Sequence, residues 1–142
     1  MLRQTAVLSS YKSLIIMLKE KILVVEDDVD TQKFLQLFLR KYYEIDICWT
    51  EDSFYELLSL NPYKLIIMDI SIKGRKDGLQ LTNELKNSKS YSHIPIICLS
   101  ANVLYSDVQN AYDAGADVFL SKPVSNELLL RTISETLQKF SL

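Results

Sequence analysis

Charged side chains of the types used in metal and phosphate chemistry directly follow three apolar runs in this sequence. They are Glu26 and Asp27 after the run 22–25, Asp69 after the run 65–68, and Lys122 after the run 118–121. An apolar run that breaks abruptly into polar groups is typical of a buried parallel strand that delivers them to the ligand-binding edge of its sheet. We therefore expect these side chains to meet at one edge of a sheet and to carry out the chemistry of the protein there.

The elements that must position these side chains begin at Lys21, where short β-type runs start to alternate with longer runs of helical period. This alternation predicts a parallel sheet with helices on both faces. The predicted strands span 21–25, 44–49, 64–69, 95–100 and 117–121, and the predicted helices span 29–42, 53–60, 78–88, 104–114 and 125–139.

Local signals mark the boundaries and the buried faces of these helices. The segment Ser53-Phe54-Tyr55-Glu56 has the form of a capping box and predicts a helix start at Ser53. Gly115 suits a left-handed cap at the end of helix 104–114. The apolar stripes expected to face the core are Phe34, Leu35, Phe38, Leu39 and Tyr42 in the first helix, and Leu129, Ile133, Leu137 and Phe140 in the last.

Five consecutive strand–helix units with right-handed crossovers form a doubly wound α/β fold, (βα)5, whose five-stranded parallel sheet has the order 2-1-3-4-5. This order places the first and third strands side by side where the winding reverses, so Glu26, Asp27 and Asp69 share one crevice. Their mutual repulsion would raise the pKa of at least one carboxyl group unless a cation intervenes. Oxygen ligands with open positions suit Mg²⁺, which keeps several waters and binds carboxylates together with phosphate oxygens. The sequence thus predicts a Mg²⁺ site.

Length and composition indicate one ordinary globular domain, because 142 residues with 48% hydrophobic content suffice for a single core. The net charge of −2 gives no general attraction to phosphate backbones, so direct binding of nucleic acid is not expected. Cys48 and Cys98 each lie in an apolar strand-like run, so buried reduced thiols and a cytoplasmic location are expected. The longest apolar stretches fall far short of the roughly 20 residues that a membrane-spanning helix needs.

Residues 1–20 form an N-terminal extension that stands apart from the domain over residues 21–142. The extension has no acidic residue before Glu20 and no Ala-x-Ala cleavage site, which argues against a secretory signal peptide. It is either a frayed tail, as chain ends often are, or a short amphipathic helix that docks on the domain or on a second chain. Met17 is an alternative start of the chain. The residues at helical spacing are Leu8, Tyr11, Ile15 and Leu18.

At the positions that carry the chemistry, the sequence resembles the receiver domains of two-component response regulators, which have a flavodoxin-like, chemotaxis-regulator-like fold. The likeness runs from about Lys21 to about Lys139. Besides the acidic pair and the strand that ends at Asp69, the matching segments are Cys98-Leu99-Ser100-Ala101, Ala114-Gly115-Ala116-Asp117 and Lys122-Pro123. The spacing of these segments carries the resemblance, because a lone Lys-Pro or Asp-Asp step would mean little.

The resemblance implies that Asp69 is the phosphoacceptor, a nucleophile that takes a phosphoryl group from the phosphohistidine of a partner kinase. It implies that Asp27 binds Mg²⁺ directly together with Asp69 and the main-chain carbonyl of Ser71, whereas Glu26 acts through a metal-bound water. It also implies that Lys122 pairs with a phosphoryl oxygen as a compact point charge. Phosphoryl transfer depends on positioning and charge neutralisation, and these residue types supply both.

The same resemblance implies a switch. Ser100 and the adjacent Ala101 are expected to bind the phosphoryl group, and the movement of Ser100 is expected to draw the following loop inward. Phe119 is expected to turn from an exposed position into the space that this movement vacates. The Lys122–Pro123 peptide bond is expected to be cis. The surface expected to report the switch to a downstream protein comprises helix 104–114, strand 117–121 and helix 125–139.

The loop 70–77 is one residue longer than in the commonest form of the family, and Asp77-Gly78 marks the start of the following helix. The basic residues of this loop, Lys73, Arg75 and Lys76, are expected to be solvated, and the alternative is that they attract an acidic surface of the kinase.

Two further functions compete with the phosphoacceptor hypothesis. An aspartate-nucleophile phosphatase of the haloacid dehalogenase type places a second carboxylate two residues after the nucleophile, where this chain has Ser71. A receiver-like interaction module would never accept phosphate, although this chain has every residue that the chemistry requires. His93, the only histidine, lies in a polar loop and is expected at the surface rather than in a Ser-His-Asp triad.

The phosphoacceptor hypothesis implies a sensor histidine kinase or a histidine phosphotransfer protein as donor and a downstream protein as target, with homodimerisation left open. The protein would then be a signalling domain that catalyses only its own phosphorylation and dephosphorylation. The chain ends just past the last predicted helix, so no DNA-binding or enzymatic output module is expected. It would be a free-standing regulator, a phosphorelay intermediate or a receiver taken from a longer hybrid kinase.

Overall fold

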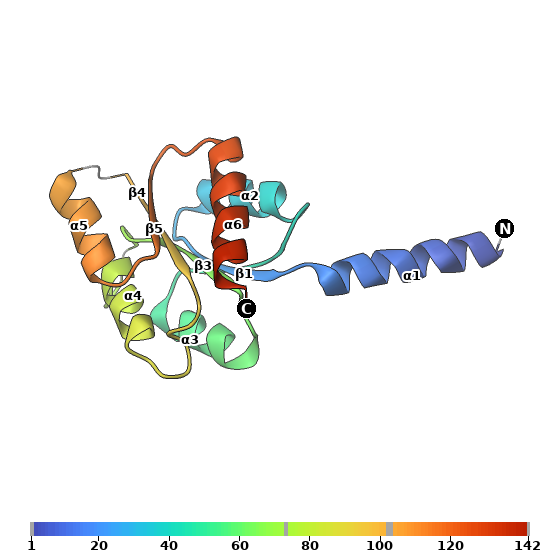
Figure 1. Ribbon diagram of the computed structural model, residues 1–142, viewed down its shortest axis with the longest axis horizontal. Helices are drawn as coiled ribbons and strands as arrows, with labels where there is room; N and C mark the ends of the chain where they lie inside the picture. Colours follow the sequence, from blue (N-terminus) through green and yellow to red (C-terminus); the bar gives the residue numbers. More distant parts are fainter. Residues whose placement is uncertain (1, 73, 102–103, 142) are drawn as a thin grey trace.

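A single parallel sheet organises the chain in the computed structural model, which describes residues 2–72, 74–101 and 104–141, with residues 2 and 12–18 described by their backbone (Figure 1). The strands follow the order β2-β1-β3-β4-β5, and every neighbouring pair is parallel. They are β1 (Lys21–Val25), β2 (Glu44–Cys48), β3 (Leu65–Asp69), β4 (Ile96–Ser100) and β5 (Val118–Ser121). The predicted doubly wound fold and its strand order are confirmed.

The helices that follow the strands pack on both faces of the sheet. They are α2 (Val29–Leu39), α3 (Glu51–Leu60), α4 (Gly78–Lys86), α5 (Tyr105–Asp113) and α6 (Asn126–Phe140), and α1 (Leu2–Leu18) precedes the first strand. One core cluster combines Phe54, Leu81 and Ala111 of α3, α4 and α5 with one face of the strands. The opposite cluster packs Leu35 and Leu39 of α2 and Leu129, Ile133 and Leu137 of α6 against the other face. Both faces of the central strands are therefore dry, as expected for a parallel sheet. Phe34, which was expected to face the core beneath α2 and α6, is 49% exposed.

Alternation along each central strand divides its side chains between these two cores. In β1, Leu23 and Val25 join the core beneath α3, α4 and α5, whereas Ile22 and Val24 join the core beneath α2 and α6. All four side chains are at most 1% exposed. Burial on both faces fixes the register of the strand, since a one-residue slip would exchange the two faces. The position at which each strand ends, and thus the residue that it delivers, is fixed by the same packing.

Several predicted helix details were wrong. The helix α3 begins at Glu51 because Thr50 is its N-cap, so Ser53 is the reciprocal partner within the capping box and not its first residue. The helix α2 ends at Leu39, before Tyr42, and Tyr42 is 50% exposed. Phe140, predicted to be buried, is 39% exposed.

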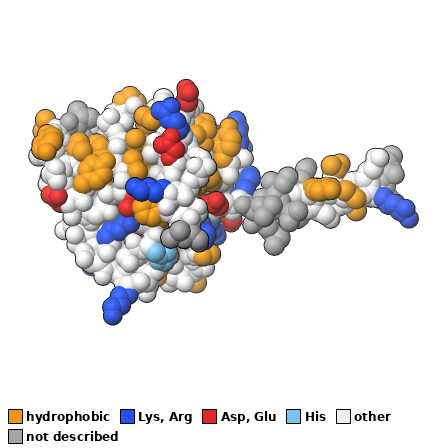
Figure 2. Space-filling view, viewed as in Figure 1, with side chains coloured by type: hydrophobic (Ala, Val, Ile, Leu, Met, Phe, Trp, Pro, Cys, Tyr) orange, Lys and Arg blue, Asp and Glu red, His pale blue; other side chains and the backbone are white. Residues whose placement is uncertain are grey.

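The N-terminal extension is helical, and α1 projects away from the sheet instead of docking on it (Figure 1). The choice between a frayed tail and a helix that docks on a second chain stays a prediction. Among the described side chains of α1, Val7, Leu8 and Tyr11 are exposed apolar groups. Figure 2 shows apolar side chains on this helix. No helix in the described part of the chain combines the length and apolar character needed to cross a bilayer.

The turn between α5 and β5 depends on Gly115, as predicted from its place after the helix. Its φ of 108° lies in the left-handed region, and a Cβ atom there would lie 2.7 Å from Cγ of Lys86. Lys86 occupies this position because its ammonium group binds Asp117 at 2.8 Å and the carbonyl of Ile94 at 2.8 Å. The glycine therefore permits both the backbone turn and the approach of the lysine.

We expect Gly115→Ala to lower the free energy of unfolding by about 1–2 kcal/mol, because an L-residue is strained at this φ. Gly74→Ala is the matched control, since a Cβ at Gly74 would meet only the carbonyl oxygen of Lys76, at 3.7 Å. That control should change stability by no more than about 0.5 kcal/mol. Urea unfolding of both variants measures the difference, and equal stabilities would contradict the assignment.

Candidate functional site

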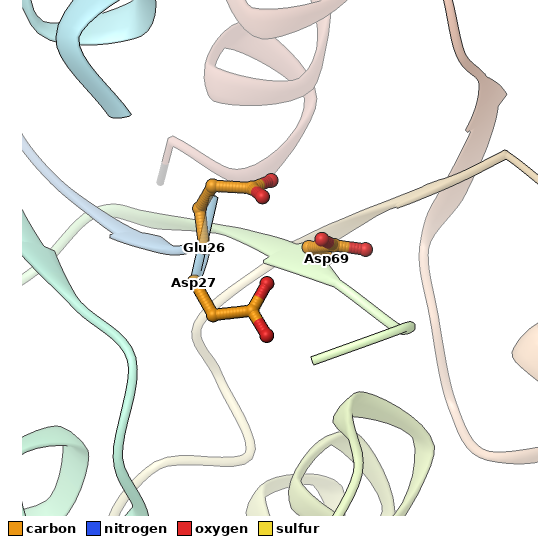
Figure 3. A group of neighbouring side chains, drawn as sticks. All are labelled: Glu26, Asp27 and Asp69. Atoms are coloured by element: carbon orange, nitrogen blue, oxygen red, sulfur yellow. The ribbon is translucent and has the colours of Figure 1, made fainter. Parts of the chain in front are cut away.

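Three carboxylates meet at the C-terminal edge of the sheet (Figure 3). Glu26 and Asp27 follow β1, and Asp69 ends the adjacent strand β3, so the strand order alone makes them neighbours. One carboxylate oxygen from each of the three residues lies within 4.8 Å of the others. Glu26 is 1% exposed and Asp69 is 3% exposed, while Asp27 is half-buried. An all-oxygen cluster of this size fits a hard divalent cation such as Mg²⁺.

Lys122 reaches this cluster from the end of β5. Its ammonium nitrogen lies 3.0 Å from Oε2 of Glu26 and 3.3 Å from Oδ2 of Asp69. Its backbone N–H donates to the carbonyl of Ser100 at 2.8 Å, which continues the pairing of β5 with β4. The peptide bond between Lys122 and Pro123 is cis. The sheet thus brings all four charged residues singled out in the sequence to one place.

Ser71 holds the other oxygen of the Asp69 carboxylate. The backbone N–H of Ser71 donates to Oδ1 of Asp69 at 3.0 Å, and its hydroxyl donates to the same atom at 2.7 Å. The two oxygens of Asp69 therefore have different environments, one bound by Ser71 and the other facing the ammonium group of Lys122. Metal coordination by the Ser71 carbonyl stays a prediction.

The pKa values of the two buried carboxyl groups, Glu26 and Asp69, are shifted in opposite directions. Burial alone would raise the pKa of Asp69, but the two hydrogen bonds from Ser71 and the charge of Lys122 outweigh it and hold that pKa below its ordinary value. For Glu26, burial dominates over the hydrogen bond from Lys122, and its pKa is raised, with the charge of Asp69 acting in the same direction. Burial alone would lower the pKa of Lys122, but its carboxylate partners Glu26 and Asp69 outweigh burial and raise that pKa. Asp69 is thus ionised and Lys122 protonated at neutral pH.

The predicted switch residues lie beside the cluster. Ser100 ends β4 and is fully buried, and the adjacent Ala101 is exposed. Phe119 is half-buried and packs against the core beneath α3, α4 and α5, so it is less exposed than expected for the resting state. The contact of Ser100 and Ala101 with a phosphoryl group, and the movement of Ser100 and Phe119, stay predictions.

Two contributors to the site were not recognised from the sequence. Gly78 lies against the end of β3, where a Cβ atom would be 2.6 Å from the carbonyl oxygen of Asp69. The side-chain amide of Gln32 donates to the carbonyl of Glu26 at 2.5 Å and fixes the backbone after β1. The Asp77-Gly78 step was noted as a helix start, and Asp77 is indeed the N-cap of α4, but a close approach between distant segments leaves no local pattern.

The basic residues of the loop 70–77 behave differently from one another. The side chain of Arg75 is 88% exposed, as predicted. The side chain of Lys76 is 32% exposed, and its ammonium group binds both Glu51 and Glu84, partners that the sequence did not indicate. Lys73 lies outside the described residues.

Comparison with known proteins connects this geometry to a family. A family model for the response regulator receiver domain matches residues 22–134. The transcriptional regulatory protein HprR of Escherichia coli is 36% identical over 125 residues, which cover 86% of this chain and 54% of HprR. A probable cyclic di-GMP phosphodiesterase of Vibrio cholerae is 31% identical over 117 residues, which cover 82% of this chain and 26% of that protein.

A solved structure shows the same fold. The signal receiver domain of a signal transduction histidine kinase from Syntrophus aciditrophicus superposes with a TM-score of 0.78 at 28% identity, over 84% of this chain and 91% of that domain. The chain spans about half the length, or less, of the curated relatives that it matches.

We expect the affinity for Mg²⁺ to rise with pH through the raised pKa of Glu26 and then to level off. In the metal-free protein this carboxyl group keeps its proton at pH values where an ordinary glutamate, with a pKa of 4.5, has lost it. The proton therefore competes with the cation. Isothermal titration calorimetry between about pH 5 and about pH 8 measures the effect. Glu26→Gln should flatten the profile, and a flat wild-type profile would contradict the expectation.

We further expect Asp27→Asn to weaken Mg²⁺ binding by at least about tenfold, because it removes a charged oxygen ligand from the cluster. Asp30→Asn is the control, since Asp30 is an exposed acidic residue in the first turn of α2. It should leave the affinity within about twofold of wild type. Equal losses in the two variants would indicate a nonspecific effect of charge.

Proposed function

The chain belongs to the family of response regulator receiver domains, the phosphoacceptor modules of two-component signalling, and on that premise we propose that Asp69 accepts the phosphoryl group. The observation that carries the proposal is the environment of the Asp69 carboxylate. It is buried, with one oxygen bound by Ser71 and the other facing Lys122, and two further carboxylates lie within a cation's reach. A surface aspartate that serves only as a cap has no need of such partners.

In the proposed reaction a carboxylate oxygen of Asp69 attacks the phosphorus of a phosphohistidine. The new P–O bond forms as the P–N bond breaks, and the leaving imidazole nitrogen keeps the electron pair and takes up a proton. The ionised state of Asp69, maintained by its lowered pKa, makes a separate general base unnecessary. Mg²⁺ bound by Asp27, Asp69 and the Ser71 carbonyl would neutralise charge on the phosphoryl oxygens. Glu26 would act through a metal-bound water.

After transfer, Lys122 would pair with a phosphoryl oxygen, since its ammonium group already lies 3.3 Å from Oδ2 of Asp69. The added phosphate brings roughly −1.5 to −2 charge and strong acceptors. Ser100, at the end of the neighbouring strand, would donate its hydroxyl to this group, with Ala101 contributing beside it. The resulting shift of the loop after β4 would change the packing of Phe119 on β5.

The donor would be a sensor histidine kinase or a histidine phosphotransfer protein, and an apolar groove beside the site suits its approach. The groove adjoins Lys122 and lies between α2 and the loop that connects β5 to α6, with Phe34, Leu35, Leu99, Pro123 and Val124 among its lining residues. Phe34 is 49% exposed there. An apolar donor surface packed on this groove would hold the histidine at the open side of the cluster. The exchange would take place in the cytoplasm, where Cys48 and Cys98 stay reduced.

The proposed surface for a downstream protein consists of α5, β5 and α6. On α5 and directly before it, apolar groups are strongly exposed, with Leu104 at 70%, Tyr105 at 83% and Tyr112 at 46%, and Figure 2 shows apolar side chains gathered over this helix. Aromatic residues of this kind anchor many protein interfaces. Ser100 and Phe119 would connect this surface to the phosphoacceptor site, so its shape would depend on phosphorylation.

The competing functions have less support. A haloacid-dehalogenase-type phosphatase would use an acid or base two residues after the nucleophile, and the residue there, Ser71, is a hydroxyl that donates to Asp69. His93 is exposed in the loop before β4, at the opposite edge of the sheet from the carboxylates. An interaction module that never accepts phosphate would bind its partner equally well with Asp69→Asn.

We expect intact mass spectrometry after incubation with Mg²⁺ and a small acyl phosphate to show the gain of one phosphoryl group. The gain should disappear on treatment with hydroxylamine, because an acyl phosphate is labile to that nucleophile. Asp69→Asn and a chelator should each abolish it, and Asp52→Asn, an exposed carboxylate at the same edge, should not. Steady release of phosphate from varied phosphoesters would instead favour the phosphatase, and a stable unmodified mass would favour the interaction module.

A further inference from the structure

The loop between β3 and α4 begins and ends next to the phosphoacceptor Asp69. It leaves β3 at Asp69 and returns at Gly78, which lies against the carbonyl oxygen of the same Asp69. Within the first half, Ser71 binds the Asp69 carboxylate and Ile72 is 5% exposed in the core. The loop is therefore anchored at Ser71 and Ile72 on one side and at Gly78 on the other.

An open pocket borders the second half of this loop. It has a volume of about 230 Å³ and is lined by Trp49, Ile72, Gly74, Arg75 and Lys76 among others. Gly74 contributes no side chain to fill that space. Since apolar contact is incomplete here, polar contacts must determine where the loop lies.

The polar contacts converge on Lys76. Its ammonium nitrogen lies 2.8 Å from Oε1 of Glu51, the first residue of α3, and 2.5 Å from Oε1 of Glu84 in α4. The hydroxyl of Tyr55 donates to the other oxygen of Glu84. The hydrogen bonds from Lys76 and Tyr55 hold the pKa of Glu84 below its ordinary value, so this partner is ionised at neutral pH. One lysine thus ties the loop to two helices at once.

The neighbouring cation cannot replace it. Arg75 is 88% exposed, and its closest acidic atom, an oxygen of Glu51, lies 3.9 Å away. Without Lys76, two carboxylates that now share one ammonium group would repel each other across the loop. Networks of this kind fix geometry better than isolated surface ion pairs, because several partners constrain the same group.

We propose that Lys76 is a positioning residue for the Mg²⁺ site: by tying the loop 70–77 to α3 and α4, it sets where Ser71 presents its carbonyl and its hydrogen bonds to Asp69. This inference rests on the proposed function and extends it to a residue that touches neither the metal nor the phosphoryl group. The substitution Lys76→Met should loosen the loop without altering any ligand. Lys76→Arg keeps the charge, and the open pocket that borders the loop leaves room for the larger group.

The test compares wild type with Lys76→Met, Lys76→Arg and Arg75→Met. Calorimetry should show Mg²⁺ affinity about three- to tenfold weaker in Lys76→Met, largely restored in Lys76→Arg and within about twofold of wild type in Arg75→Met. In the metal-free protein, amide hydrogen exchange at Ser71 and Ile72 should be faster in Lys76→Met alone. Phosphorylation by a small acyl phosphate should need more Mg²⁺ but reach a similar rate at saturation.

Unchanged Mg²⁺ affinity in Lys76→Met would overturn the inference, as would an equal loss in Arg75→Met or unchanged exchange at Ser71 in the metal-free protein. Urea unfolding identifies a loss that arises from global instability, which would also count against a positioning role. If the wild-type protein binds no Mg²⁺ and takes up no phosphoryl group, the proposed function itself fails. If wild type does both and Lys76→Met matches it, only the role of Lys76 fails.

Discussion

Two carboxylates buried side by side are tolerated in this protein because one ammonium group lies between them. Glu26 and Asp69 are almost inaccessible to water, and the single cation within hydrogen-bond distance of both, among the described residues, is Lys122. Isolated ionised groups at such depth would cost several kcal/mol each. The arrangement needs three strands to end at the same edge, with β5 delivering the lysine to carboxylates that follow β1 and β3. The strand order is thus a condition for the stability of the site as well as for its chemistry.

The placement of the carboxylates and of Lys122 was predictable because the ends of buried strands can be recognised in a sequence. Residues 65–68 are apolar and fully buried, and a charged residue follows them directly, so the end of the strand can be recognised in the sequence. The strand order of a doubly wound sheet then determines which charged residues meet. Glu26, Asp27, Asp69 and Lys122 were all found in this way. Their pairing distances and the unequal pKa values of Glu26 and Asp69 were not, because those depend on burial that only the folded chain defines.

The wrong and missing predictions concern details that the local sequence does not determine, namely which residue caps a helix, where the core ends and which distant residue a side chain binds. Thr50 and Ser53 both carry hydroxyls suited to an N-cap, and in the fold Thr50 is the cap while Ser53 is its reciprocal partner. Phe140 follows the helical stripe of α6, yet the core ends one turn earlier, so the ring stays partly exposed. Lys76 looked like part of a solvated basic loop because its partners, Glu51 and Glu84, come from separate helices and leave no signal near it in the sequence.

The indole of Trp49 has a practical consequence for following this protein in real time. It is the only tryptophan in the chain, it is 54% exposed, and it lines the open pocket that borders the loop carrying Ser71. Emission excited selectively in this ring arises from one location, and indole emission is sensitive to nearby charge and solvent. The molecule therefore contains its own optical reporter in the pocket that borders the loop 70–77, and stopped-flow experiments on it require neither a dye nor an added label.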